Sequence, residues 1–378
     1  MPKNRLKDAL HELNIDGLGP SAEHALTSAF RTVESLGLAD FAHASRVCGL
    51  SIESVQRLAL EVMATQAPPL TPALDAHCAR ELVDAVLPTG LRELDWLLGG
   101  GLATGEVTEL AGGPCSCKTQ LCLLACAAQV VLPSGASVLY LDTSSAFRPE
   151  RIHEHLRLLD ASAIADGQGS GSLPARLRDL RLVAAAQLPQ LLFELERLDA
   201  ELEDAASATT GSGDDATVPS PRRAADEEED DDVDWLRRLR LLVVDSVFTA
   251  MLAEHSGETR SAAGAQQARL QQLLRRLATR HRLAVLLTNA PSIGGGAAGA
   301  EPSTAFGGHA WNHLADTRVL LTRDGPAGAA VAHVVKCPHS IRRLVQSTDG
   351  AVRITCQPHG GIIGERCPGS PNYHLARH

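Results

Sequence analysis

The sequence predicts an α/β protein in which a small all-helical N-terminal domain precedes a core built on a twisted, mainly parallel β-sheet. Three observations lead to this prediction. Short apolar runs alternate with amphipathic stretches after about residue 80, which is typical of a parallel sheet covered by helices. Residues before 66 show only helical periodicity. Finally, 378 residues with 44% hydrophobic side chains suffice for two domains with buried cores.

The predicted N-terminal domain spans residues 1–66. Leu26, Phe30 and Val33 follow one another at helical spacing, and a later amphipathic helix carries apolar residues over 52–62. Prolines 68, 69 and 72 then interrupt the pattern, as in a connecting segment. We therefore expect a linker at 67–85, a core at 86–366 and a short tail at 367–378.

Strands in the core are expected at residues 106–110, 137–142, 239–245 and 283–289, because each is a short apolar run between helical patterns. The intervening stretches 188–202 and 266–281 each carry leucines on one helical face. These leucine faces are expected to pack on the sheet.

An acidic run occupies residues 226–234. Its eight carboxylates account for most of the net charge of −10. The segment before it is rich in Gly, Ser, Thr and Pro and offers little apolar surface to bury. We therefore expect a disordered acidic insertion at about 203–234 that acts as a solvated loop, with a docking tail as the alternative.

A glycine-containing loop between a predicted strand and a predicted apolar helix has the pattern of a phosphate-binding P-loop. Its residues are Gly112, Gly113, Pro114, Cys115, Ser116, Cys117, Lys118 and Thr119. In such a loop, backbone N–H groups and the helix N-terminus hold phosphates, and the lysine and hydroxyl serve phosphate oxygens and Mg²⁺. Cys117 stands where the motif has glycine, and a chance Gly/Lys/Thr loop is the alternative.

Two further strands end in polar side chains suited to the same site. Asp245 follows the apolar run 241–244, and a carboxylate there is a candidate Mg²⁺ ligand together with Thr119. Asn289 ends the run 286–289 and is a candidate sensor of the γ-phosphate. The alternative for both is a residue that simply forms a turn.

The nine cysteines show no disulfide framework, and no apolar run is long enough for a signal peptide or membrane span. We expect a soluble intracellular protein with free thiols. Cys115 and Cys117 would lie at a helix N-terminus beside Lys118, where a thiol pKa falls. The hypothesis is that oxidation or alkylation of these two thiols blocks the binding of ATP.

Segments across most of the chain are similar to the eukaryotic RecA-like strand-exchange recombinases, most closely to the D-type branch of their DNA-repair paralogues. The matching segments are 88–102, 104–109, 118–122, 140–143, 147–151 and 286–289. The resemblance implies a RecA-like P-loop core that binds ATP and Mg²⁺.

The chain departs from the family pattern at several positions. Ser144 stands where the family has its catalytic glutamate, and Ala290 follows Asn289 where the family has glutamine. Residues 252–260 resemble the first DNA-binding loop, but Leu252 and Glu258 replace family arginines. These departures imply slow or absent hydrolysis and weak DNA contact at that loop.

Residues 291–308 resemble the second DNA-binding loop of the family and contain no Lys or Arg. Phe306 and Trp311 are the aromatic candidates for stacking on bases, and Lys336, Arg342 and Arg343 are the candidate cations. The alternatives are a disordered hairpin loop and a solvated charged face.

The resemblance implies a nuclear, hetero-oligomeric subunit of a mediator complex in homologous recombination repair. Its partners would be sister recombinase paralogues, the central recombinase, and single-stranded or branched DNA, without a membrane. Two alternatives stay open. One is a DNA-stimulated ATPase in which Glu109 or Glu150 replaces the missing base. The other is a nucleotide-free interaction scaffold with a degenerate P-loop.

Overall fold

The computed structural model describes most of the chain in two units, residues 1–82 and 83–378. The described residues are 6–13, 18–37, 39–65, 85–131, 136–165, 177–208, 224–255, 260–290, 311–325, 329–338, 350–357 and 361–367. The two units divide within the predicted linker at 67–85. Nearly all of that segment, and the tail from residue 368, lie outside the described residues, so both remain predictions.

The first unit is helical, as its periodicity predicts. It contains α1 (Leu6–Leu13), α2 (Pro20–Ala29), α3 (Val33–Gly37), α4 (Phe41–Cys48) and α5 (Ile52–Thr65). The predicted apolar positions Leu26, Phe30 and Val33 are buried together with residues of α1 and α5. The Asp40 side chain accepts a hydrogen bond from the Ala42 N–H and thereby caps α4.

The second unit is built on one large sheet with the order β11-β10-β9-β8-β3-β7-β6-β4-β5 in the described residues. The strands from β8 to β5 are parallel to one another, and β9, β10 and β11 extend the sheet in antiparallel fashion. The parallel strands are β3 (Val107–Gly112), β4 (Ser137–Asp142), β5 (Leu180–Ala184), β6 (Leu239–Asp245), β7 (Ala284–Asn289) and β8 (Thr317–Arg323). The antiparallel strands are β9 (Ala329–Lys336), β10 (Ala351–Cys356) and β11 (Ile362–Cys367). The mainly parallel sheet is confirmed.

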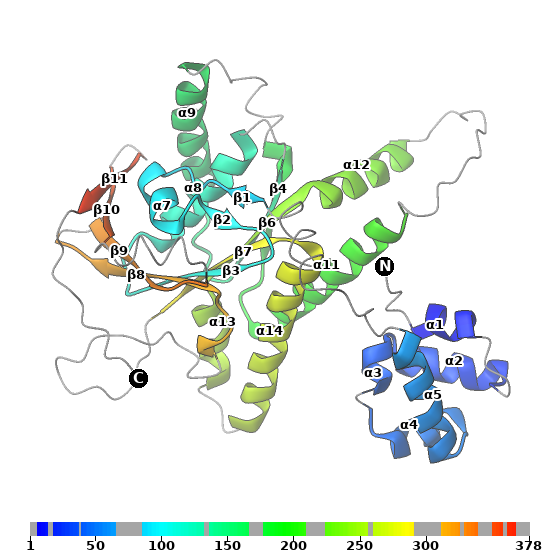
Figure 1. Cartoon of the computed structure of the whole chain (residues 1–378). Coiled ribbons are helices and arrows are strands. Elements are labelled where there is room, and N and C mark those ends of the chain that lie inside the picture. The colour runs from blue at the N-terminus through cyan, green and yellow to red at the C-terminus, as the bar shows by residue number, and fades with distance from the viewer. Residues whose placement is uncertain are drawn as a thin grey trace. The chain divides into compact units, whose positions relative to one another are not determined.

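Helices cover both faces of this sheet (Figure 1). One face packs against α7 (Arg92–Leu98), α8 (Lys118–Val131) and α9 (Pro149–Ala165), and the other against α11 (Leu188–Ala208), α13 (Val247–His255) and α14 (Arg260–His281). Side chains alternate accordingly: Leu241 and Val243 belong to the first cluster, and Leu242 and Val244 to the second. This two-sided burial explains why the strands read as continuous apolar runs.

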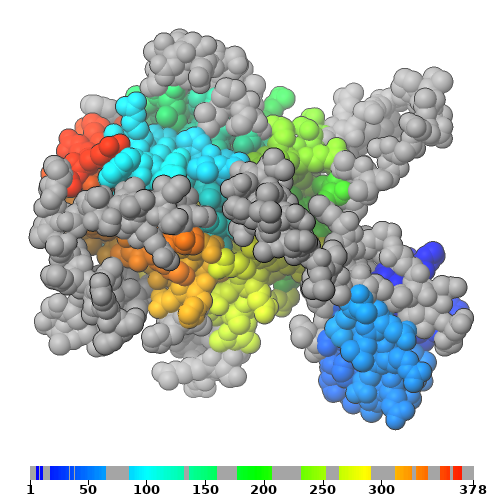
Figure 2. Space-filling model, viewed as in Figure 1, coloured from blue at the N-terminus to red at the C-terminus, as the bar shows by residue number. Residues whose placement is uncertain are grey.

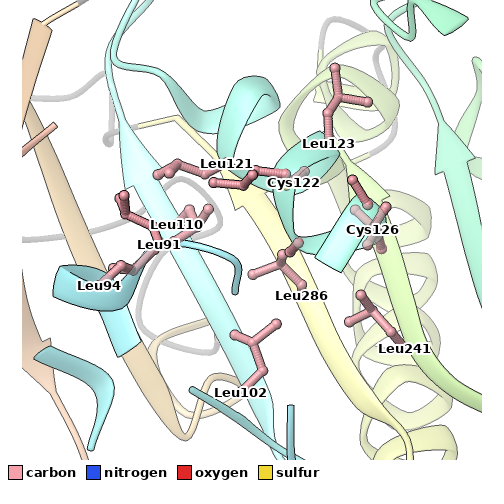
Figure 3. Packing of buried hydrophobic residues seen from close by; sticks show 14 of the residues in the cluster. Leu91, Leu94, Leu102, Leu110, Leu121, Cys122, Leu123, Cys126, Leu241 and Leu286 are labelled. Atoms are coloured by element: carbon pink, nitrogen blue, oxygen red, sulfur yellow. The ribbon is translucent and has the colours of Figure 1, made fainter. Parts of the chain in front are cut away.

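Helix α8, which follows the glycine-containing loop, packs on the sheet. Figure 3 shows Leu121, Cys122 and Cys126 of α8 above Leu110, Leu241 and Leu286 of three neighbouring strands. A short antiparallel pair, β1 (Val86–Leu87) and β2 (Leu102–Ala103), precedes β3. In Figure 2 the red surface of the last strands adjoins a cyan surface, consistent with the contacts of α7 with β10 and β11.

The acidic segment differs from the expected disordered insertion at both of its ends. Helix α11 continues to Ala208, and α12 (Ala224–Arg238) contains the whole acidic run, while residues 209–223 lie outside the described part. Trp235 explains the second helix: it is 4% exposed and donates to the Asp179 carbonyl in η1 (Leu177–Asp179) at 3.1 Å. One buried aromatic therefore anchors an otherwise polar helix.

Ion pairs explain why α11 extends beyond the predicted residue 202. Arg276 of α14 lies 2.7 Å from Glu203 and 3.1 Å from Asp199, and Arg280 lies 2.5 Å from Glu203. His281 contacts Asp199 at 2.8 Å. The two arginines neutralise carboxylates that would otherwise form a cation site with His281. Among the described residues, no helix combines the length and apolar character needed to cross a membrane.

His155 of α9 gives the fold a pH dependence that can be measured. Its side chain is 1% exposed, and neither ring nitrogen has a hydrogen-bond partner among the described residues. Burial, with the charge of Arg151 in second place, lowers its pKa from 6.5 to about 4. Between these values only the unfolded chain takes up the proton, so stability present above pH 6.5 is lost as the pH falls towards 4.

We expect His155→Leu to remove this loss. Relative to the wild type, the variant should gain about 3 kcal/mol in unfolding free energy between pH 7 and pH 4. Urea titrations of both proteins at several pH values measure the difference. Parallel pH profiles for the two proteins would contradict the assignment.

Candidate nucleotide-binding site

The glycine-containing loop connects β3 to α8 in the strand, loop and helix order that a P-loop requires. Gly112 ends β3, and α8 begins at Lys118. A Cβ at Gly112 would lie 2.6 Å from both the Leu321 carbonyl oxygen and Ser116 Oγ, so only glycine fits there. A Cβ at Gly113 would meet nothing within 4 Å. The missing Cβ of Gly112 thus lets the loop backbone lie close to β8.

Lys118 lies over this loop. Its Nζ donates to the carbonyls of Gly112 and Gly113, both at 2.7 Å, and contacts Ser116 Oγ at 3.3 Å. Burial lowers the pKa of Lys118, and the negative charge of Asp245 acts in the opposite direction. The structure therefore brings together Lys118 and Asp245, the two residues that the sequence placed in one site.

Asp245 is buried at the end of β6 and is held by two hydroxyl groups. Tyr140 Oη donates to Oδ2 at 2.8 Å, and Thr288 Oγ1 donates to Oδ1. The Phe147 ring packs edge-on against Tyr140 with centroids 5.0 Å apart. Each carboxylate oxygen accepts one of these hydrogen bonds and retains a lone pair for a metal-bound water. The residues predicted for the site did not include Tyr140 and Thr288. These two lie on β4 and β7, the strands on either side of β6.

Asn289 lies at the end of β7, as expected, but its amide is engaged. Its Nδ2 donates to Glu109 Oε1 at 2.7 Å, and Trp311 Nε1 donates to the same oxygen at 2.7 Å. Arg318 Nε donates to Glu109 Oε2 at 2.5 Å. Glu109 is 0% exposed. Glu109 therefore cannot act as a substitute catalytic base, and the expectation that it might is wrong.

Ser144 lies just past β4 and is exposed. Its N–H and hydroxyl approach Asp142 Oδ1 at 3.0 and 3.4 Å, and Ala146 and Phe147 N–H groups donate to the same carboxylate. Asp142 thus orders the turn that leads into α9. The other proposed base, Glu150, is exposed in the first turn of α9.

Cys115 and Cys117 adopt left-handed backbone conformations with φ of 60° and 67°. Glycine adopts this conformation freely, whereas an L side chain costs about 1–2 kcal/mol per residue. Cys115 is exposed and Cys117 is 8% exposed. The backbone at these two positions therefore has the conformation that favours glycine, and the two cysteines adopt it with strain.

The donor set fits a nucleotide phosphate chain with Mg²⁺. A compact cation, a hydroxyl at Thr119 and the N-terminus of a 14-residue helix converge at one end of the parallel sheet. The buried carboxylate of Asp245 interacts with this cation.

Comparison with known proteins decides the family. A family model described as Rad51 matches residues 80–162 and 234–346, which together are more than half of the chain. The chain belongs to the Rad51 family. Its core is accordingly RecA-like, as the resemblance implied.

The Rad51-family relatives cover most of this chain. The DNA repair protein RAD51 homolog 4 of Bos taurus is 30% identical over 83% of this chain and 85% of its own length. The DNA repair and recombination protein RadA of Metallosphaera sedula is 28% identical over 86% and 89%. The DNA repair protein RAD51 of Saccharomyces cerevisiae is 30% identical over 87% and 74%.

Two expected DNA contacts of this Rad51-family chain are corrected by the structure. Trp311 is 0% exposed and bound to Glu109, so it cannot stack on a base. Lys336 Nζ donates to the Asn312 carbonyl at 2.9 Å and to that of Ala315, and burial lowers its pKa. Both residues are structural, because Trp311 lies in the core and the Lys336 ammonium group binds backbone carbonyls.

The loop segments of the Rad51-family chain are described only in part. Residues 252–255 belong to α13 rather than to a loop, and 256–259 lie outside the described residues. Residues 291–310, with Phe306, and residues 339–349, with Arg342 and Arg343, also lie outside them. Their expected roles remain predictions.

Proposed function

We propose that this chain binds ATP with Mg²⁺ in its P-loop. One observation carries the proposal: the strand, loop and helix have no room for a Cβ at Gly112 and hold the Lys118 ammonium group on the loop carbonyls, where the charge of Asp245 acts on it. The loop from Gly112 to Thr119 would hold phosphates through backbone N–H groups. Lys118 would contact the β- and γ-phosphates.

Thr119 and Asp245 would hold Mg²⁺, directly or through water, and Asn289 would contact the γ-phosphate after exchanging its hydrogen bond to Glu109. A bound metal would neutralise charge on the phosphates. The hydroxyl groups of Tyr140 and Thr288 fix the orientation of the Asp245 carboxylate before the metal binds. These residues position a nucleotide, whereas Ser144 supplies no general base for its hydrolysis.

We propose further that the chain acts in homologous recombination repair as a subunit of a hetero-oligomeric mediator complex in the nucleus. Its partners would be sister paralogues, the central recombinase, and single-stranded or branched DNA. The support is family membership together with relatives that are called DNA repair proteins. A subunit that binds ATP and hydrolyses it slowly would use the nucleotide to stabilise an assembly.

The second candidate function is a nucleotide-free scaffold. Cys115 and Cys117 favour it, because each places a Cβ at a left-handed position of the phosphate loop. A true ATPase is the third candidate and would require the exposed Glu150 as its base.

A titration of a fluorescent ATP analogue with Mg²⁺ separates these functions when turnover is followed in the same samples. Wild type, Lys118→Ala and Cys117→Gly are compared. We expect wild-type binding without appreciable turnover, and a loss of about tenfold to a hundredfold in affinity for Lys118→Ala because a charge-assisted contact to phosphate is removed. Binding only after Cys117→Gly would establish the scaffold, and rapid turnover would establish the ATPase.

A further inference from the structure

Two thiols from distant parts of the chain meet beside the phosphate loop. Cys117 is the last residue before α8, and Cys356 ends β10, 239 positions later. Cys356 Sγ donates to Cys117 Sγ over 3.2 Å. Neither cysteine forms a disulfide in this structure. The contact joins the loop to the antiparallel extension of the sheet.

The two thiols differ in exposure. Cys117 is 8% exposed, whereas Cys356 is only partly buried. Burial raises the pKa of both Cys122 and Cys126 in α8, which keeps those two thiols inert.

The two sulfurs are already in contact. A disulfide places its sulfurs about 2.05 Å apart, so the two atoms need to approach by only about 1.1 Å. Cys356 is held from both sides, because β10 pairs with β9 and with β11. Cys117 is the less constrained partner, since it lies in the loop in a strained conformation.

We propose that Cys117 and Cys356 form a reversible disulfide that lowers the affinity of the P-loop for nucleotide. The effect on affinity rests on the proposed ATP binding. The oxidant is hydrogen peroxide. One sulfur of the pair, as its thiolate, attacks a peroxide oxygen; the O–O bond breaks, the leaving hydroxide takes up a proton, and a sulfenic acid and water form. The other thiol then attacks the sulfenic sulfur, the S–S bond forms, and a second water leaves.

The effect on nucleotide follows from the position of Cys117. Lys118 donates to the carbonyls of Gly112 and Gly113 in this structure and has to exchange those contacts for phosphate oxygens when nucleotide binds. A covalent bond to β10 at the preceding residue restrains that rearrangement. Reduction releases the loop again.

The first test maps the bond in the full chain without nucleotide. The protein is treated with hydrogen peroxide, the remaining thiols are alkylated, and the peptides are identified by mass spectrometry. We expect a peptide pair linking Cys117 to Cys356 that disappears after dithiothreitol and is absent in Cys356→Ser. Cys367→Ser, which removes a cysteine from the neighbouring strand β11, should keep the pair. No such link, or a link through Cys115 instead, would overturn the proposal.

The second test measures binding of the fluorescent ATP analogue before and after peroxide. Wild type and Cys367→Ser should lose about tenfold in affinity and regain it with dithiothreitol, whereas Cys356→Ser should not change. A mapped disulfide with unchanged affinity would refute the effect of the disulfide on nucleotide binding. Absence of binding in the reduced wild type would refute the proposed ATP binding instead, while the mapping result would stand.

Discussion

Replacing Glu109 by glutamine is expected to lower the free energy of unfolding by about 3–5 kcal/mol. Glu109 is fully buried and pairs with Arg318, which is only 5% exposed. Glutamine preserves the volume and one carbonyl acceptor for Asn289 and Trp311, but it leaves the guanidinium without a counter-charge. An uncompensated buried charge is more costly than the lost hydrogen bond alone. Urea unfolding followed by tryptophan fluorescence measures the change.

The double variant Glu109→Gln with Arg318→Met is the control. It removes both charges and keeps the acceptor for Asn289 and Trp311, so it should recover most of the stability. A single variant as stable as the wild type would show that the buried ion pair contributes little. A double variant no more stable than the single one would show that the cost comes from packing.

Gly112→Ala is expected to be the second large effect. The added Cβ would lie 2.6 Å from the Leu321 carbonyl oxygen of the paired strand β8, and this backbone atom cannot move without disturbing the sheet. We expect a loss of about 3 kcal/mol in unfolding free energy. The same shift displaces the loop under Lys118, so affinity for the ATP analogue should fall as well. Chemical denaturation and nucleotide titration measure the two effects separately.

Gly113→Ala is the matched control for stability. Nothing lies within 4 Å of a Cβ at this neighbouring position, so its stability should stay within about 0.5 kcal/mol of the wild type. Equal losses for the two variants would mean that loop entropy, and not the contact with Leu321, determines the requirement for glycine.

Much of the core could be predicted because its signals are local. Four strands of the core lie within two residues of their predicted bounds, because buried parallel strands read as short continuous apolar runs. The P-loop followed from residue types at fixed spacing. Asp245 and Asn289 were predicted because each ends a short apolar run after the loop.

The acidic helix could not be predicted from its composition. Eight carboxylates in residues 226–234 favour disorder, but Trp235 is buried and the Arg181 guanidinium lies 4.2 Å from its ring centroid. Arg238 also pairs with Asp179 at 2.7 Å. Anchoring contacts at one end outweigh the local preference, and they involve residues more than 50 positions away.

The sequence by itself predicted the helical first unit, the parallel sheet and the residues proposed for the nucleotide site, since each depends on periodicity or on a motif of a few positions. Only the tertiary structure decided that Glu109 and Trp311 form a buried network and that Cys117 meets Cys356. These contacts join residues about 200 positions apart or more. Their partners are selected by strand order and register, and no local pattern in a single chain encodes those.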